Sequence, residues 1–200
     1  GSWLDFEFDH KNVLFARIDR KRKIHATVIF KAMGYSTQEI LDMFYHKETI
    51  KLDKKGNHTR ALDFDLLIGT RAMEDINDKA GKPLVKKGKK FTKIATKKMT
   101  DAGIKELPIT VEELVGQVVA EDLFDASTGE VLCLANEALS ESKLQELMEA
   151  GIKEVKTLYI DMINFGDQVR NTLLLDKTDT KDEASVSYTH LRAHETDSYL

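Results

Sequence analysis

An internal repeat restricts the possible folds of this chain more than any other feature of its sequence. The pentapeptide AGIKE occurs at 102–106 and again at 150–154, an offset of 48 residues. Two copies are too few for a solenoid, so we expect two related halves packed over one core. The same offset pairs Gly81 with Gly129, Leu84 with Leu132, Phe91 with Leu139 and Met99 with Leu147, and with one residue of slippage Leu67-Ile68-Gly69 pairs with Leu114-Val115-Gly116.

Both copies predict the same order of elements. The first strand begins at the first glycine and is followed by a turn. A second strand, a helix and a last strand come next. Thr92 and Ser140 are suitable N-caps for the two helices. The pattern therefore predicts a duplicated β-β-α-β unit at 64–109 and 112–158. In each copy one glycine ends the turn and another ends the helix: Gly81 and Gly103, then Gly129 and Gly151.

The residues before the repeat predict a β-hairpin followed by two short helices. Residues 3–8 alternate apolar and acidic side chains, and the apolar run at 12–18 follows a polar turn. Apolar residues at 25–33 form a helical stripe that ends at Gly34. Ser36 and Glu39 then have the spacing of a capping box for a second helix. The polar stretch 46–60 indicates a boundary between this part of the chain and the repeat.

Two basic segments suggest contact with an anionic partner. The seven residues from Arg17 to Lys23 contain five basic side chains, three of them arginines, whose planar groups suit phosphates and base edges. The alternative is that this segment only joins the hairpin to a small helix pair. The run from Lys82 to Lys98 contains eight lysines. An ordinary solvated surface is the favoured interpretation of this run, and phosphate contact is the alternative.

The composition and the motifs argue against an active site within the chain. The sequence has no phosphate-binding loop, no cysteine pair for zinc and no HExxH motif, and its carboxylates form no evident catalytic pair. No apolar run is long enough to cross a membrane, and the single cysteine, Cys133, fits a reducing compartment. The chain begins at Gly1-Ser2-Trp3 without methionine. We therefore expect an excised piece of a longer, cytoplasmic protein.

Three segments together resemble one family. GSWLDFEFD, ARIDRKRK and TVIFKAMGYSTQEILDMFY resemble the lobe domain of the bacterial DNA-directed RNA polymerase beta subunit, and residues 157–178 resemble the return of the same lobe. The resemblance implies an α+β fold in which a mixed lobe domain is interrupted by a β-rich insertion related to the sandwich-barrel hybrid fold. The implied ranges are 1–45 for the first part of the lobe, 46–150 for the insertion and 151–186 for the return.

The resemblance also implies a function and its residues. In this family the lobe forms a wall of the downstream DNA cleft, and a tryptophan that matches Trp3 stacks on a non-template base at the edge of the transcription bubble. The implied DNA-binding residues are Trp3, Asp19, Arg20, Lys21, Arg22 and Lys23. For Trp3 the alternative is a core position. A second interpretation of the chain, as a protein-interaction module, assigns the function to the insertion, which would dock transcription regulators or other subunits.

The implied protein is a nucleotidyltransferase, but this chain is expected to carry none of its catalytic residues. The resemblance implies no cofactor here, since the catalytic magnesium belongs to another subunit. It implies DNA and the alpha, beta-prime, omega and sigma subunits as partners, no membrane, and a place at the bacterial nucleoid.

The sequence departs from the family at several positions and at its end. His10 and His25 stand where the family usually has proline, Leu174 stands where it often has arginine, and Gly166-Asp167 replaces a Gly-Pro step. Residues 187–200 resemble translated sequencing adapter, so we expect this tail to be non-native. The helical spacing of His190 and His194, which would suit a metal, is rejected with the tail.

Overall fold

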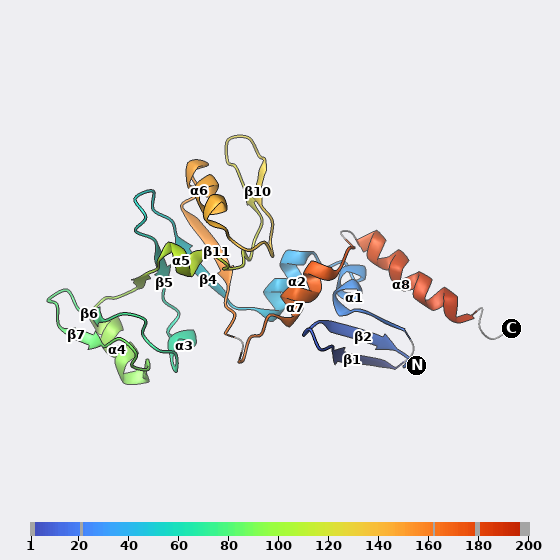
Figure 1. The fold of residues 1–200 in the computed structure, drawn as a ribbon, viewed down its shortest axis with the longest axis horizontal. Helices are drawn as coiled ribbons and strands as arrows, with labels where there is room; N and C mark the ends of the chain where they lie inside the picture. Colours follow the sequence, from blue (N-terminus) through green and yellow to red (C-terminus); the bar gives the residue numbers. More distant parts are fainter. Residues whose placement is uncertain (1–2, 21, 162, 179–180, 197–200) are drawn as a thin grey trace. The chain divides into compact units, whose positions relative to one another are not determined.

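The computed structural model describes residues 3–20, 22–161, 163–178 and 181–196. Within these ranges the chain has the predicted α+β fold, built from small antiparallel sheets and helices (Figure 1). The chain divides into two compact units. The first unit comprises 1–47, 117–139 and 157–200, and the second comprises 48–116 and 140–156. The ranges expected for the lobe and its insertion stay a prediction.

The predicted N-terminal hairpin is confirmed. Strand β1 (Leu4–Phe8) pairs antiparallel with β2 (Leu14–Ile18), and Leu4 lies opposite Ile18. In the connecting turn the carboxylate of Asp9 accepts hydrogen bonds from the backbone N–H groups of Lys11 and Val13, at 2.8 and 2.9 Å. A third strand, β3 (Lys23–His25), pairs with β2 and was not predicted. The basic segment therefore connects two strands of a sheet, instead of leading directly into a helix.

The two predicted helices are also confirmed. Helix α1 (Ala26–Ala32) is followed by Gly34, whose φ of 102° is in the left-handed region that a helix end requires. Helix α2 (Thr37–Phe44) begins with the predicted capping box: the hydroxyl of Ser36 accepts from the backbone N–H of Glu39 at 3.2 Å, and the Glu39 carboxylate accepts from the backbone N–H of Ser36 at 2.7 Å.

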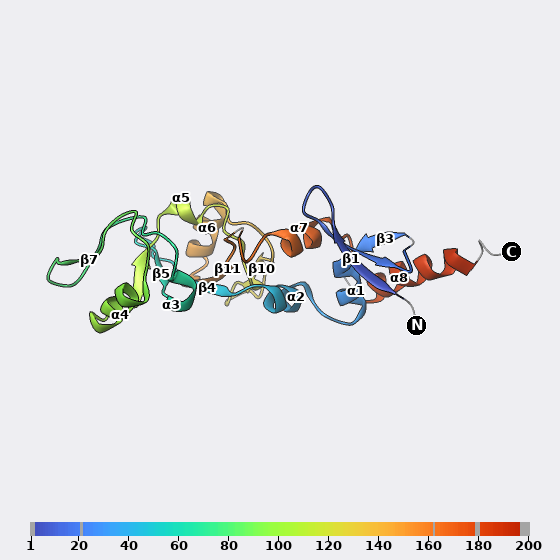
Figure 2. The ribbon, with the colours of Figure 1, turned by 90° about the horizontal axis from the view of Figure 1, so that it is seen from below.

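The core of the first unit is built by α2, by α7 (Gln168–Leu175) and by residues from 118–120, 135 and 158, with Phe30 of α1 packed against it. Helix α1 also contacts α8 (Lys181–Thr196), and both views show the two helices next to each other (Figures 1 and 2). The non-native origin expected for 187–200 stays a prediction, and the side chains of His190 and His194 lie outside the described residues. The buried members of this core are Ile40, Leu41, Tyr45, Val118, Ala120, Ala135, Leu158, Val169 and Leu173.

A buried ion pair joins α1 to the end of α7. Lys31 Nζ lies 3.3 Å from the carboxylate of Asp176, and the two side chains are only 7% and 1% exposed. The same carboxylate accepts hydrogen bonds from the hydroxyl of Thr27, at 2.8 Å, and from the backbone N–H of Thr178, at 2.9 Å. The hydroxyl of Thr178 donates to it as well, and the Lys31 ammonium also donates to the carbonyl of Thr178.

The duplicated β-β-α-β order is present in the structure. Each copy begins with a four-residue helix and continues with a β-hairpin, a nine-residue helix and a further strand. Thr92 and Ser140 cap their helices as predicted. The first copy has α3 (Phe64–Leu67), β6 (Ile76–Asn77), β7 (Pro83–Val85), α4 (Lys93–Asp101) and β8 (Glu106–Pro108). The second has α5 (Val111–Leu114), β9 (Leu123–Phe124), β10 (Val131–Cys133), α6 (Glu141–Glu149) and β11 (Glu154–Leu158).

The two copies also share a specific hydrogen-bond pattern. The N–H of Gly88 donates to the carbonyl of Ala72 at 2.7 Å, and the N–H of Asn136 donates to the carbonyl of Val119 at 2.8 Å. Gly88 and Asn136 are equivalent positions, with φ of 76° and 77°. Glycine adopts this left-handed conformation without steric cost, and asparagine is one of the few other residues that tolerates it. The backbone conformation is therefore the same at Gly88 and Asn136, although the residue types differ.

The polar stretch 46–60 contains two strands that the sequence analysis missed. Strand β4 (Lys47–Lys51) and strand β5 (Thr59–Ala61) are antiparallel, with Ile50 opposite Arg60. They belong to a sheet with the strand order β11-β4-β5-β8. A second core cluster, within the second unit, contains Ala72, Ile76, Val85, Phe91 and Met99. No helix among the described residues has both the length and the apolar character needed to cross a membrane.

Candidate nucleic-acid interface

One face of the N-terminal sheet carries charged side chains that neutralise one another. Arg17 lies directly opposite Asp5 on one side and Lys23 on the other, so these side chains project from the same face. The carboxylate of Glu7 accepts from Arg17 Nη2 at 2.8 Å, and Lys23 Nζ lies 3.8 Å from the same oxygen. The Lys23 ammonium also lies over the ring of Phe15, 4.4 Å from its centroid. Arg17 and Lys23 are therefore held by this sheet.

Trp3 is fixed by its backbone while its side chain is free. Its N–H donates to the carboxylate of Asp19 at 2.7 Å, and its carbonyl accepts from the N–H of Asp19 at 2.9 Å. The backbone bond continues the pairing of β1 with β2 by one residue, and the bond to the carboxylate adds a second anchor. The Trp3 side chain is 76% exposed. The core alternative is therefore wrong, and the exposed indole is available for stacking on a flat group.

The turn after β2 has a strained backbone. Asp19 and Arg20 both have positive φ, 49° and 61°, although neither is glycine. A non-glycine residue in this region costs about 1–2 kcal/mol, and such residues concentrate at functional positions. The turn presents Arg20 and Arg22, both exposed, and neither has an ion-pair partner within the described part of the chain. Lys21, the residue between them, lies outside the described residues.

The structure thus separates the predicted DNA-binding residues that it describes into two groups. Trp3 and Asp19 are joined directly, whereas Arg20, on the turn, and Arg22, just before β3, form no ion pair with any described residue. Lys23 is instead committed to Glu7 and Phe15. The sequence analysis did not assign a role to Glu7, although the alternating pattern of β1 places it on the charged face. An exposed indole on the residue that pairs with Asp19, together with the exposed guanidinium groups of Arg20 and Arg22 that follow Asp19 in the chain, provides the parts for base stacking and for phosphate contact.

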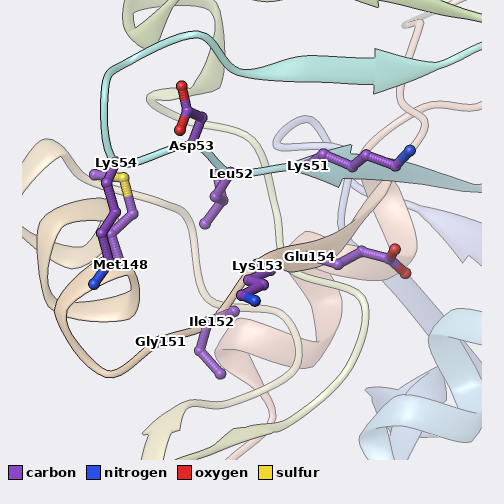
Figure 3. Close-up of a pocket in the computed structure, with 9 residues that line it drawn as sticks. All are labelled: Lys51, Leu52, Asp53, Lys54, Met148, Gly151, Ile152, Lys153 and Glu154. Carbon is purple, nitrogen blue, oxygen red and sulfur yellow. The ribbon is translucent and has the colours of Figure 1, made fainter.

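A hollow in the second unit is a weaker candidate for a site. Its volume is about 490 Å³, and Figure 3 shows the side chains that line it. A hydrogen bond to the carboxylate of Glu106 raises the pKa of Lys51, so this ammonium stays protonated and is unsuited to act as a base. The hollow is lined by Lys51, Leu52, Asp53, Lys54, Met148, Gly151, Ile152, Lys153 and Glu154.

Within the ranges that the structure covers, no group of three or more histidine, cysteine, aspartate or glutamate side chains is placed to hold a metal ion. The expectation that this chain carries no cofactor stays a prediction.

The comparisons with known proteins identify the family. Residues 1–101 match the family described as RNA polymerase Rpb2, domain 2. The chain belongs to this family. Along almost its whole length it corresponds to a segment of bacterial DNA-directed RNA polymerase beta subunits, as the resemblance of its N-terminal motifs implied.

Three beta subunits illustrate the similarity, and each aligns with 96% of this chain. The DNA-directed RNA polymerase subunit beta of Sorangium cellulosum (strain So ce56) is 47% identical over 194 residues. The subunits of Syntrophotalea carbinolica (strain DSM 2380 / NBRC 103641 / GraBd1) and Myxococcus xanthus (strain DK1622) are 46% and 42% identical, over 193 and 207 residues. The chain spans only 14–15% of the length of these relatives.

Proposed function

We propose that this chain forms part of the wall of the downstream DNA cleft in a bacterial RNA polymerase, a nucleotidyltransferase, and contacts non-template DNA at the edge of the transcription bubble. The observation that carries the proposal is the arrangement of Trp3 and the adjacent turn. The exposed indole of Trp3 is anchored through the Trp3 backbone to Asp19, and the next residue along the chain, Arg20, presents a guanidinium group that no described carboxylate neutralises.

The roles of the residues follow from their surroundings. Trp3 stacks on an unpaired base, since stacking requires only an exposed ring and tolerates any base. Arg20 and Arg22 contact phosphates, because no carboxylate within the described residues neutralises them. Lys23 supports the sheet through Glu7 and Phe15 and contributes less to DNA binding. Catalysis and the magnesium ion are assigned to other parts of the assembled enzyme, and the alpha, beta-prime, omega and sigma subunits are proposed as further partners of this chain.

Binding of a forked DNA by the assembled polymerase tests these roles. Trp3→Ala should weaken binding by about 1–3 kcal/mol, the usual value for one stacked base, without changing the salt dependence. Arg20→Ala should lower the magnitude of the slope of log K against log salt by about 0.7–0.9, the values for one phosphate contact on single-stranded and on duplex DNA. Lys11→Ala, an exposed charge at the opposite end of the hairpin, is the matched control and should change neither quantity. Unchanged binding by both Trp3→Ala and Arg20→Ala would refute the proposal.

A further inference from the structure

The two copies of the repeat have similar residues at buried positions and different residues at exposed positions. Buried positions keep apolar residues in both copies: Phe91 and Leu139 are 3% and 2% exposed, and Met99 and Leu147 are both 0% exposed. Four of the exposed positions instead invert their charge. Four lysines of the first copy correspond to four glutamates of the second: Lys82 to Glu130, Lys89 to Glu137, Lys93 to Glu141 and Lys98 to Glu146.

Helix α4 shows this difference most clearly. Its buried side contains Thr96 and Met99, and its solvent face presents three lysines and Ile94. Ile94 is 71% exposed, and Lys97 and Lys98 follow it at the spacings that place side chains on one helix face. An acidic residue, Asp101, ends the same face. We call Lys93, Ile94, Lys97 and Lys98 the α4 face.

Folding alone does not account for the α4 face. Ser142 occupies the position of Ile94 in the second copy, and α6 has the same length and the same type of cap. An isoleucine left in water forgoes most of the roughly 1.5–3 kcal/mol that its burial would contribute. The lysines are also uncompensated, because none of the eight between 82 and 98 forms an ion pair within the described residues. In α6, by contrast, Lys143 pairs with Glu146 at 2.9 Å.

We propose that the α4 face docks an acidic segment of a protein, whose carboxylates pair with Lys93, Lys97 and Lys98 while an apolar side chain covers Ile94. Protein interfaces combine an apolar centre with a polar rim in this way. A nucleic acid is less suitable, because the run contains no arginine, and its aromatic residue, Phe91, is buried and cannot stack on a base. A phosphate backbone would also leave Ile94 uncovered. The inference does not depend on the DNA contacts of Trp3 and Arg20.

Three probes and the assembled polymerase test the proposal. The first probe is a synthetic helical peptide in which one leucine is flanked by glutamates, the second is the same peptide with serine in place of leucine, and the third is a short DNA duplex. Ile94→Ser copies the residue of the second repeat at an exposed position, so the fold should be retained. This variant should weaken binding of the leucine peptide about fivefold or more, the effect of a central interface residue, and leave the other two probes unchanged.

The charges are tested with a matched pair of double variants. Lys97→Gln/Lys98→Gln should weaken binding of both peptides, whereas Lys54→Gln/Lys55→Gln, which removes the same charge from an exposed loop, should not. Equal losses in the two double variants would show a response to net charge only and would overturn the proposal. No effect of Ile94→Ser on the leucine peptide would also overturn it. Binding of the DNA duplex through Lys97 and Lys98, with no binding of either peptide, would assign the α4 face to nucleic acid instead.

Discussion

Replacing Asp176 with alanine should open the packing of α1 against the end of α7. The Asp176 carboxylate is 1% exposed and holds four donors: the Lys31 ammonium, the Thr27 hydroxyl, and the backbone N–H and hydroxyl of Thr178. Alanine would leave the Thr27 hydroxyl without its acceptor. It would also leave the buried Lys31 ammonium, 7% exposed, with the carbonyl of Thr178 as its remaining partner.

The expected cost follows from this burial. Removing one partner of a buried ion pair usually destabilises a protein by about 3–5 kcal/mol, because the remaining charge is uncompensated. Burial alone raises the pKa of Asp176, but hydrogen bonds from Thr178 and Thr27 and the charge of Lys31 outweigh it, so the pKa lies below its ordinary value of 3.8. The contribution of Asp176 is therefore fully present above pH 3.8 and is lost as the pH falls through the lower pKa of the folded state.

Hydrogen-exchange mass spectrometry on the assembled polymerase at neutral pH measures the effect locally. Amides of α1 and α7 should exchange at least about 100-fold faster in Asp176→Ala, since each 1.4 kcal/mol corresponds to a factor of ten. Amides of α4, in the second unit, serve as the internal reference and should not change. Lys31→Met/Asp176→Leu, which removes both charges, should recover much of the protection. Exchange of α1 within about twofold of the unsubstituted protein would refute the reasoning.

Three further changes have definite expected outcomes. Gly88→Asn should be tolerated, as at the equivalent Asn136, whereas Gly88→Val should lower stability by about 1–2 kcal/mol in thermal unfolding. A Cβ added at Gly88 meets no atom within 4 Å, so the cost comes from the positive φ. Asp161 accepts from the backbone N–H groups of Phe165, Asn164 and Ile163, which lowers its pKa to about 2. An NMR titration of its carboxyl should therefore show a midpoint near 2, with the turn stabilised above 3.8 and losing that support as the pH falls toward 2; a midpoint near 3.8 would contradict the turn geometry. Asp19→Ala should weaken forked-DNA binding, while Asp19→Asn, which retains an acceptor for the Trp3 N–H, should bind nearly normally; equal losses would indicate that the charge of Asp19 matters instead.

Local signals in the sequence predicted much of the fold. The capping box at Ser36, the helix end at Gly34 and the alternation in β1 each depend on neighbours within a few residues, and each is confirmed. The repeat predicted the β-β-α-β order because equal buried positions recur at a fixed offset. A second capping box, Thr110 with Glu113, was present in the sequence and would have located α5.

Other features depend on contacts that no local pattern encodes. Strand β4 has one fully buried residue, Ile50, and its polar side chains conceal the alternation of a strand. No glycine in the sequence marks the positive φ values of Asp19 and Arg20. The bond from the Trp3 N–H to the Asp19 carboxylate joins residues sixteen positions apart, which no local pattern predicts. The residue types of the candidate interface could therefore be predicted from the sequence, whereas only the structure shows that Lys23 is paired and that Arg20 and Arg22 have no ion-pair partner among the described residues.

The discontinuous course of the chain affects how its parts can be removed. The chain passes between the two compact units after Lys47, Gly116, Leu139 and Lys156. Deleting 46–150 as one block would therefore also remove Val118, Ala120 and Ala135 from the core of the first unit. The hydrophobic surface exposed by such a truncation would favour misfolding, and a loss of transcription would then say little about the removed segment. Shorter excisions within 48–116, which spare that core, would give an interpretable result.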